Sequence, residues 1–526
     1  MTKTMKIFTG LIIFLLAATV TDAAKAKEKK SNKTKSEQKK PAPASAVPAD
    51  VIEKEAKEIE KKPEPAEKKP DAATSDMTMA PAAPPVPAPT HETDEAPVKH
   101  YLRGGMIATN TYYIDPTINP GLYSGFFRPF GKYTYNEKWE FTARGNIILK
   151  HYAQQLGPIK QTNLVGSLEI LAGETKIAGH HLMAGRNFYA IEQGLLFANF
   201  ADGISYSGKY RFGQIRGFAV YSGDYGSSLC ALNVTGCNGD PGPFVNTPNL
   251  LPDSGIQNSG QRLFFAAEYF SPEYLGGQLF SYFLLSRDMI KESGSNTKYA
   301  YNPWYGGIGA RGYMGNSAYR YRGEFIYQGG GTYNQVLNGV SEATTISAFA
   351  ALVNFTWSMP VLKNIDPQLT LDIAVGSGDG DSTRVTNGSQ SNTAGNYNAF
   401  QNFGSFSGGL ALKPRLANMQ VYRLGTYFRP FKSMYALRNL SAQLKYSYYR
   451  KSVAAGGISD PGATEANADV GHAADLALVF NAKADVQFFY GFGLFKPGGA
   501  YPITQYDGTS GQAWRYAHLV SLTLIF

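Results

Sequence analysis

Apolar and polar residues alternate along most of the chain beyond its first hundred residues. In residues 139–150, Trp139 and Phe141 fall on one face of an extended chain, and Arg144 and Lys150 fall on the other. A period of two residues is the signature of a strand whose two faces meet different surroundings. About eighteen such segments, each of roughly ten to fourteen residues, follow one another. The pattern predicts an all-β fold.

The apolar face of these segments is rich in aromatic residues. In residues 319–328, for example, Tyr319 and Tyr321 alternate with Arg320 and Arg322. A soluble sandwich also alternates, but its apolar face is seldom this aromatic. In a membrane barrel the apolar face meets lipid and the polar face lines the lumen. The sequence therefore predicts a transmembrane antiparallel β-barrel.

The connections between the predicted strands alternate in length. Long extracellular loops and short periplasmic turns alternate in this way in outer-membrane barrels, which have an even number of strands. We expect eighteen strands, both termini in the periplasm and a water-filled channel. The predicted long loops are 114–121, 152–162, 188–202, 222–260, 287–298, 329–343, 377–417, 451–470 and 497–511, and the short turns lie near Asn136, Glu174, Phe212, Pro272, Asn316, Asn364, Lys432 and Lys483.

Composition separates a leader from the barrel. The first hundred residues contain no Tyr or Trp, and two lysines precede an apolar stretch at 7–20. This arrangement is typical of a signal peptide, which we assign to residues 1–24. Residues 25–98, rich in Lys, Glu, Pro and Ala, are predicted to form a disordered periplasmic segment. That segment is either a solvated tether or an arm that contacts cell wall or periplasmic proteins, and residues 99–526 form the barrel.

The remaining composition narrows the protein class further. The barrel region has no apolar run of about 18 residues, which a helical membrane span needs. Two cysteines exclude a disulfide-rich scaffold, and Cys230 and Cys237, which share one long loop of an exported protein, are expected to form a disulfide.

Charged residues on the polar face are expected to point into the lumen, because a charge at mid-membrane facing lipid costs about 2–4 kcal/mol. Basic residues outnumber acidic ones in this set, which predicts a preference for anions. The alternative is that these charges pair across strands and only solvate the lumen. The predicted lumen-lining and solute-binding residues are Arg144, Lys150, Arg186, Lys209, Arg211, Arg262, Arg311, Arg320, Arg322, Arg423 and Lys445.

Motifs for other chemistry are weak. Residues 307–312 match G-x-G-x-x-G but lie inside a predicted strand, so close packing of small residues is favoured over nucleotide binding. Asp379 and Asp381 are spaced as in a calcium loop, but an EF-hand would need Glu at the position of Gln390. His180 and His181 lack a metal-binding context. No nucleophile constellation is present, so we expect no enzyme activity, cofactor, metal or nucleic-acid partner.

Several stretches resemble the alginate-export family of bacterial outer-membrane barrels. They are Gly185-Arg186 followed by Asp202-Gly203, residues 377–381 with 397–400, and residues 475–478, 489–492 and 495–498. The chain also ends on a strand whose last residue is Phe526, which resembles the assembly signal of such barrels. The resemblance implies an eighteen-stranded barrel with an Arg- and Lys-lined conduit for a polyanionic uronate polymer.

These observations predict an outer-membrane channel of a Gram-negative-type bacterium that passes anionic solutes, with an anionic polysaccharide as one candidate. Two alternatives remain open. One is a general diffusion porin. The other is a structural or adhesive surface barrel whose leader binds cell wall and whose lumen is plugged.

Overall fold

The computed structural model describes residues 100–115, 119–135, 138–152, 162–222, 262–289, 300–314, 318–334, 342–359, 362, 364–382, 392–504 and 511–526. The predicted signal peptide and leader lie outside these residues, as do Cys230 and Cys237. Within the described ranges, no helix is long and apolar enough to cross a membrane.

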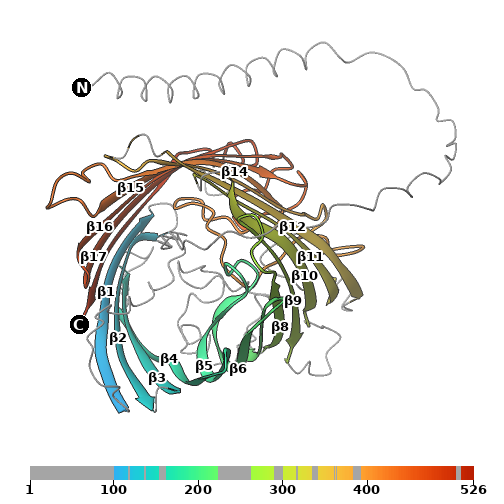
Figure 1. The fold of residues 1–526 in the computed structure, drawn as a ribbon. Coiled ribbons are helices and arrows are strands. Elements are labelled where there is room, and N and C mark those ends of the chain that lie inside the picture. Colours follow the sequence, from blue (N-terminus) through green and yellow to red (C-terminus); the bar gives the residue numbers. More distant parts are fainter. Residues whose placement is uncertain are drawn as a thin grey trace, which may run out of the picture. The chain divides into compact units, whose positions relative to one another are not determined.

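Eighteen strands form one closed antiparallel sheet, as predicted (Figure 1). Each strand pairs with its neighbours in sequence, and β1 pairs with both β2 and β18, so the ring has no open edge. The strands are β1 (His100–Asp115), β2 (Asn119–Tyr135), β3 (Trp139–Tyr152), β4 (Thr162–Ile177), β5 (His180–Ala190), β6 (Ala198–Tyr210), β7 (Gly213–Ser222), β8 (Arg262–Phe270), β9 (Gly277–Asp288), β10 (Asn302–Met314), β11 (Tyr319–Tyr333), β12 (Ala343–Ser358), β13 (Gln368–Gly376), β14 (Met419–Phe428), β15 (Leu440–Lys451), β16 (Asp469–Lys483), β17 (Val486–Pro497) and β18 (Arg515–Ile525).

The two faces of the strands differ as the alternation predicts. On β3, Phe141 and Ile147 are exposed on the outer face, where lipid would cover them, and Ile148 is buried on the inner face. The same row of exposed apolar side chains continues around the barrel, for instance at Phe325 on β11 and Val353 on β12. The outer face is therefore suited to a hydrocarbon surrounding.

The turn expected near Glu174 is wrong by several residues. Glu174 lies within β4, and its carboxylate is 2.9 Å from Nε2 of His181 on β5. The polar residues that suggest a turn are therefore ordinary inward-facing positions of a longer strand. The chain reverses instead at Ala178 and Gly179, which both have positive φ, as a tight hairpin turn requires.

The G-x-G-x-x-G match lies within β10, and its glycines are used for packing, as expected. A methyl group at Gly309 would stand 2.3 Å from Cζ of Phe280 and 2.5 Å from the carbonyl oxygen of Gly323. These separations are shorter than any van der Waals contact. The small residue thus allows the rings of β9 to lie flat against the inner wall.

We expect the substitution Gly309→Ala to lower the free energy of unfolding by about 1–3 kcal/mol, because the added methyl group overpacks this contact. Urea unfolding of the folded barrel in detergent measures the change. Gly306→Ala is the matched control on the same strand, since a methyl group there meets nothing within 4 Å. Equal stability of the two variants would show that the contact with Phe280 and Gly323 is not tight.

Candidate functional site

The hairpin of β5 and β6 leaves the barrel wall at its loop end. β4 pairs with β5 only as far as Arg186, and β7 pairs with β6 only as far as Asp202. The two strands nevertheless stay paired with each other to Ala190 and Ala198. The last turn of the hairpin, residues 191–197, is thus shorter than the predicted loop 188–202 and makes no backbone ladder with either neighbouring strand.

Gly185 marks the point where the hairpin departs. Its φ of 120° lies in a region that other residues rarely adopt, and a methyl group there would stand 2.2 Å from the carbonyl oxygen of Leu171. Only glycine fits this bend. The motif Gly185-Arg186, which suggested a family resemblance, therefore has a structural role at its first position.

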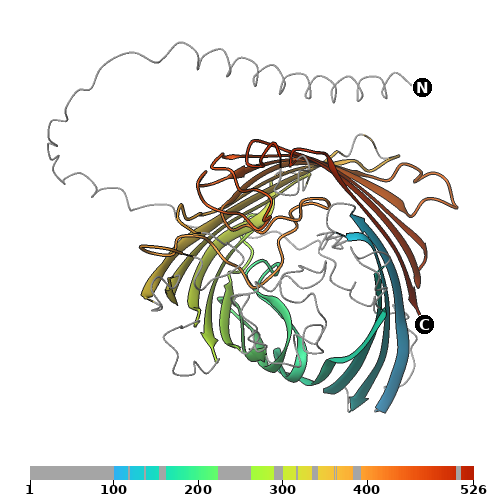
Figure 2. The same ribbon diagram turned by 180° about the vertical axis from the view of Figure 1, so that it is seen from behind.

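A second segment, residues 392–418 between β13 and β14, lies inside the ring in both views (Figures 1 and 2). On one side, Tyr305 of β10 donates to the carbonyl oxygen of Gln401 at 2.9 Å. On the other side, Arg423 of β14 donates to the carbonyl oxygen of Ser407 at 2.6 Å, and the backbone N–H of Leu410 donates to Asp475 at 3.1 Å. The segment therefore crosses the lumen.

The hairpin tip and the crossing segment meet each other. The N–H of Phe403 donates to the carbonyl oxygen of Leu196 at 2.9 Å, and the N–H of Ser405 donates to that of Gly194 at the same distance. Phe197 and Phe403 also form a bridge, and both rings are buried beside Phe264. Together the two segments form a constriction inside the barrel, and we use the name constriction for residues 191–197 and 397–416.

Charged residues gather around the hairpin tip. Nη1 of Arg311 donates to both carboxylate oxygens of Glu192, at 2.9 and 3.1 Å, and Arg322 approaches Glu192 at 3.8 Å. The N–H of Glu192 donates to Glu268 at 2.7 Å, and Glu268 also pairs with Arg216 at 3.3 Å. The tip is thus tied electrostatically to β7, β8, β10 and β11 across the lumen.

A second charged group lies on β2, β3 and β4. Arg128 and Arg144 share the carboxylate of Glu169, at 3.1 and 2.8 Å. The guanidinium of Arg144 also lies 5.5 Å from the ring centre of Phe200 on the hairpin. Nearby in the fold, Arg186 pairs with Asp202 across the hairpin at 3.3 Å.

The other residues predicted to line the lumen are more scattered. Arg262 pairs with Asp288 at 3.2 Å, Arg423 is 3.9 Å from Asp372, and Lys445 lies opposite Asp475 in the sheet. Arg320 is two residues from Arg322 on the same face of β11, and Lys209 is exposed at the end of β6. Arg211 lies in the turn between β6 and β7, so it is not a strand position. The side chain of Lys150 lies outside the described residues.

Six of the predicted arginines therefore have an acidic partner. They are Arg144, Arg186, Arg262, Arg311, Arg322 and Arg423. Pairing across strands, one of the two interpretations of these charges, describes Arg144, Arg186, Arg262 and Arg423. Arg311 pairs instead with Glu192 in the hairpin turn, and Arg322 donates to Glu324 two residues along β11 at 2.6 Å. Selectivity then depends on which member of each pair faces the aqueous space.

Three residues that contribute to this site were not among the predicted ones, namely Arg128, Gln278 and Glu192. Arg128 alternates correctly on β2 and could have been found from that pattern. Gln278, whose side-chain oxygen accepts hydrogen bonds from Arg311, could have been found in the same way on β9. Glu192 could not, because it falls in a predicted loop and lies 119 positions from Arg311. Asp202, the partner of Arg186, was predicted to matter only as part of the Asp202-Gly203 motif.

The two aspartates considered for calcium instead fasten the start of the connection between β13 and β14. Asp379 is buried and accepts hydrogen bonds from the N–H groups of Asn398 at 2.7 Å and Asp381 at 3.4 Å. Burial, reinforced by a hydrogen bond with the Asp381 carboxyl group, raises the pKa of Asp379 to about 6. Among the described residues, no cluster of three or more His, Cys, Asp or Glu side chains is arranged to hold a metal ion.

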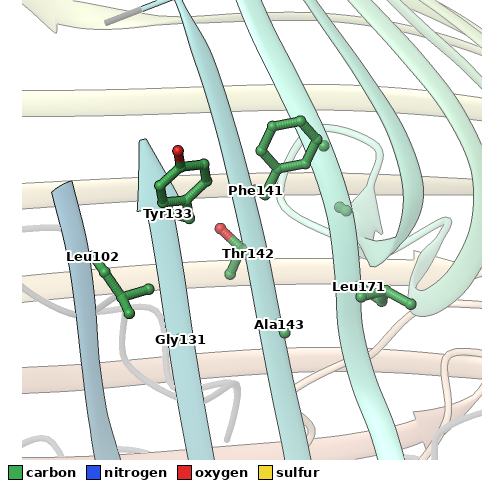
Figure 3. Close-up of a pocket in the computed structure, with 9 residues that line it drawn as sticks. Leu102, Gly131, Tyr133, Phe141, Thr142, Ala143 and Leu171 are labelled. Carbon is green, nitrogen blue, oxygen red and sulfur yellow. The ribbon is translucent and has the colours of Figure 1, made fainter. Parts of the chain in front are cut away.

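A hollow of about 370 Å³ lies on the outer face of the barrel, away from the constriction (Figure 3). Its lining comes from β1 to β4 and includes Leu102, Phe141 and Leu171, which are exposed on the lipid-facing side. Small residues at its floor, Gly131 and Ala143, leave the space open. It is a feature of the membrane-facing surface and not part of the lumen.

Comparison with known proteins agrees with this architecture. Residues 258–514 match the family described as alginate export. Among solved structures, OccK8 (OprE) of Pseudomonas aeruginosa has a TM-score of 0.51 at 10% identity, covering 81% of this chain and 98% of that one. The outer-membrane protein opdK of Pseudomonas aeruginosa and OccAB2 of Acinetobacter baumannii each have a TM-score of 0.50 at 10% identity, covering 81% of this chain and 99% and 98% of theirs.

At such low identity these structures establish the fold alone. No curated protein matches the sequence. The predicted resemblance is nevertheless confirmed over residues 258–514. With its closed eighteen-stranded sheet and its similarity to the alginate-export family over residues 258–514, the chain is an outer-membrane β-barrel.

Proposed function

We propose that this barrel is a channel that passes anionic solutes, with anionic polysaccharide chains as a candidate cargo, through the constriction. The observation that carries the proposal is the exposure of the ion pairs at the hairpin tip. The side chain of Arg311 is 41% exposed and that of Glu192 is 5% exposed. Arg216 is 39% exposed and Glu268 is 2% exposed. The cations face open space and the carboxylates lie behind them.

The charged group formed by Arg128, Arg144 and Glu169 on β2 to β4 adds to the excess of positive charge toward the lumen. Arg128 and Arg144 have one carboxylate between them, so this part of the wall carries a surplus positive charge. Two pairs have the opposite arrangement, since Asp202 is more exposed than Arg186 and Asp372 is more exposed than Arg423. Guanidinium groups bind carboxylates through paired hydrogen bonds, which suits them to a uronate or another carboxylate solute.

A structural or adhesive barrel with a closed lumen is the second candidate. The packing of the crossing segment favours it, because Tyr397 and Phe400 are fully buried against the inner wall together with Tyr305. Such packing fixes the segment in place. If the protein is a channel, the fixed segment narrows the pore. If the protein is a structural or adhesive barrel, the segment closes it.

Conductance separates these two candidates. We expect the purified protein, reconstituted into a planar bilayer, to form discrete open channels, because the charged groups at the tip remain partly exposed. A protein that inserts, as judged by protease protection, but conducts no ions would identify the plugged barrel.

We expect the double substitution Arg216→Gln and Arg311→Gln to lower the chloride-to-potassium permeability ratio by roughly two- to fivefold, because the exposed cations that attract anions are lost. Reversal potentials across a salt gradient measure the ratio. Arg438→Gln is the control, since Arg438 lies in the turn between β14 and β15, over the ring of Tyr435. An unchanged ratio in the double variant, or an equal fall in the control, would contradict the assignment.

A further inference from the structure

We propose that Arg311 and Gln278 form a carboxylate-binding site of the channel in which the chain's own Glu192 takes the place of the solute. The inference rests on the proposed function and deepens it, because it names one subsite and the ligand class, a carboxylate. It also assigns Glu192 a role as an internal competitor.

The orientation of Arg311 is fixed before any solute arrives. Nε and Nη2 donate to the side-chain oxygen of Gln278 at 3.1 and 2.8 Å, which occupies one edge of the guanidinium. The ring centre of Phe270 lies 5.3 Å from the guanidinium carbon. Nη1 is left for a carboxylate and donates to Oε1 of Glu192. A second guanidinium, that of Arg322, stands 3.8 Å from this Glu192 oxygen and also donates to Glu324 at 2.6 Å. A fixed arginine with a second cation nearby is a typical carboxylate receptor.

Glu192 is held against this site by an unusual backbone conformation. Its φ is 48°, which residues other than glycine and asparagine seldom adopt. Its N–H is fastened to Glu268 at 2.7 Å, and the neighbouring Ile191 is fully buried. Such conformations persist only where the surroundings impose them, and they concentrate at functional sites. Here the result is a carboxylate presented to Arg311.

The exposure of the two partners allows exchange. Arg311 is partly exposed, and Glu192 approaches it from the buried side. A solute carboxylate arriving through the lumen can therefore compete for Nη1 while the backbone of the tip stays in place. Because Glu192 occupies the site part of the time, the apparent affinity for the solute is the intrinsic affinity multiplied by the fraction of time that the site is free. A weaker site suits a channel, since conduction requires that a bound solute can leave.

Block of the chloride current by tri-galacturonate tests the proposal. Glu192→Gln removes the competing charge and keeps the side chain's size, so we expect the half-blocking concentration to fall about tenfold, a difference of about 1.4 kcal/mol. The double variant Glu192→Gln, Arg311→Gln should lose this gain, because the gain depends on the cation that Glu192 releases.

The alternative is that Glu192 is only a strut between the hairpin and the wall. In that case Glu192→Gln would lower resistance to urea unfolding and leave block unchanged, which would overturn the proposal. A gain in block that persists without Arg311 would also overturn it. If Glu192→Gln fails to fold, Gln278→Leu is the second variant, and it should weaken block because Arg311 loses its orientation; unchanged block there would contradict the site.

The reversal potential of the wild-type protein distinguishes a failure of the proposed anion channel from a failure of the proposed role of Glu192. An anion-selective wild type with unchanged block in Glu192→Gln would reject the internal competitor alone. A cation-selective wild type would reject the proposed function and this inference with it.

Discussion

The need to pair every backbone N–H and C=O group within the lipid governs this structure. A bilayer core offers no water to an unpaired strand edge, so a sheet can span it only when it closes. The pairing of β1 with β18 meets this requirement, and it fixes one face of each strand toward lipid and the other toward the lumen. The alternation along the sequence is a direct consequence of the closed sheet.

Departures from the wall are possible only where the backbone finds partners elsewhere. The end of the β5–β6 hairpin does not pair with β4 or β7. Its own two strands stay paired with each other, and the carbonyl oxygens of Gly194 and Leu196 accept hydrogen bonds from the crossing segment. The crossing segment, in turn, bonds to both sides of the barrel. The constriction is therefore built from backbone groups that are satisfied inside the lumen, and its charged residues are held by the same framework.

Much of the fold could be predicted from the sequence, because the period-two pattern and the alternating loop lengths report the lipid and lumen faces directly. The number of strands follows from that pattern. The position of the turn predicted near Glu174 does not follow from that pattern, because a polar inward position of a strand and a polar turn look alike in a sequence. The arginines were identifiable as inward residues, and so were strand partners such as Glu169 and Asp372, but Glu192 in the hairpin turn was not. Glu192 and Arg311 are brought together by the bend at Gly185, which alternation cannot reveal.

We propose that, in the two ion pairs at the hairpin tip, Arg311 with Glu192 and Arg216 with Glu268, the arginine faces the conducting space. The sign of the reversal potential of the wild-type protein, measured in a planar bilayer across a potassium chloride gradient, tests that claim most directly. A potential displaced toward the chloride equilibrium value is the predicted result. Displacement toward the potassium equilibrium value would contradict the account.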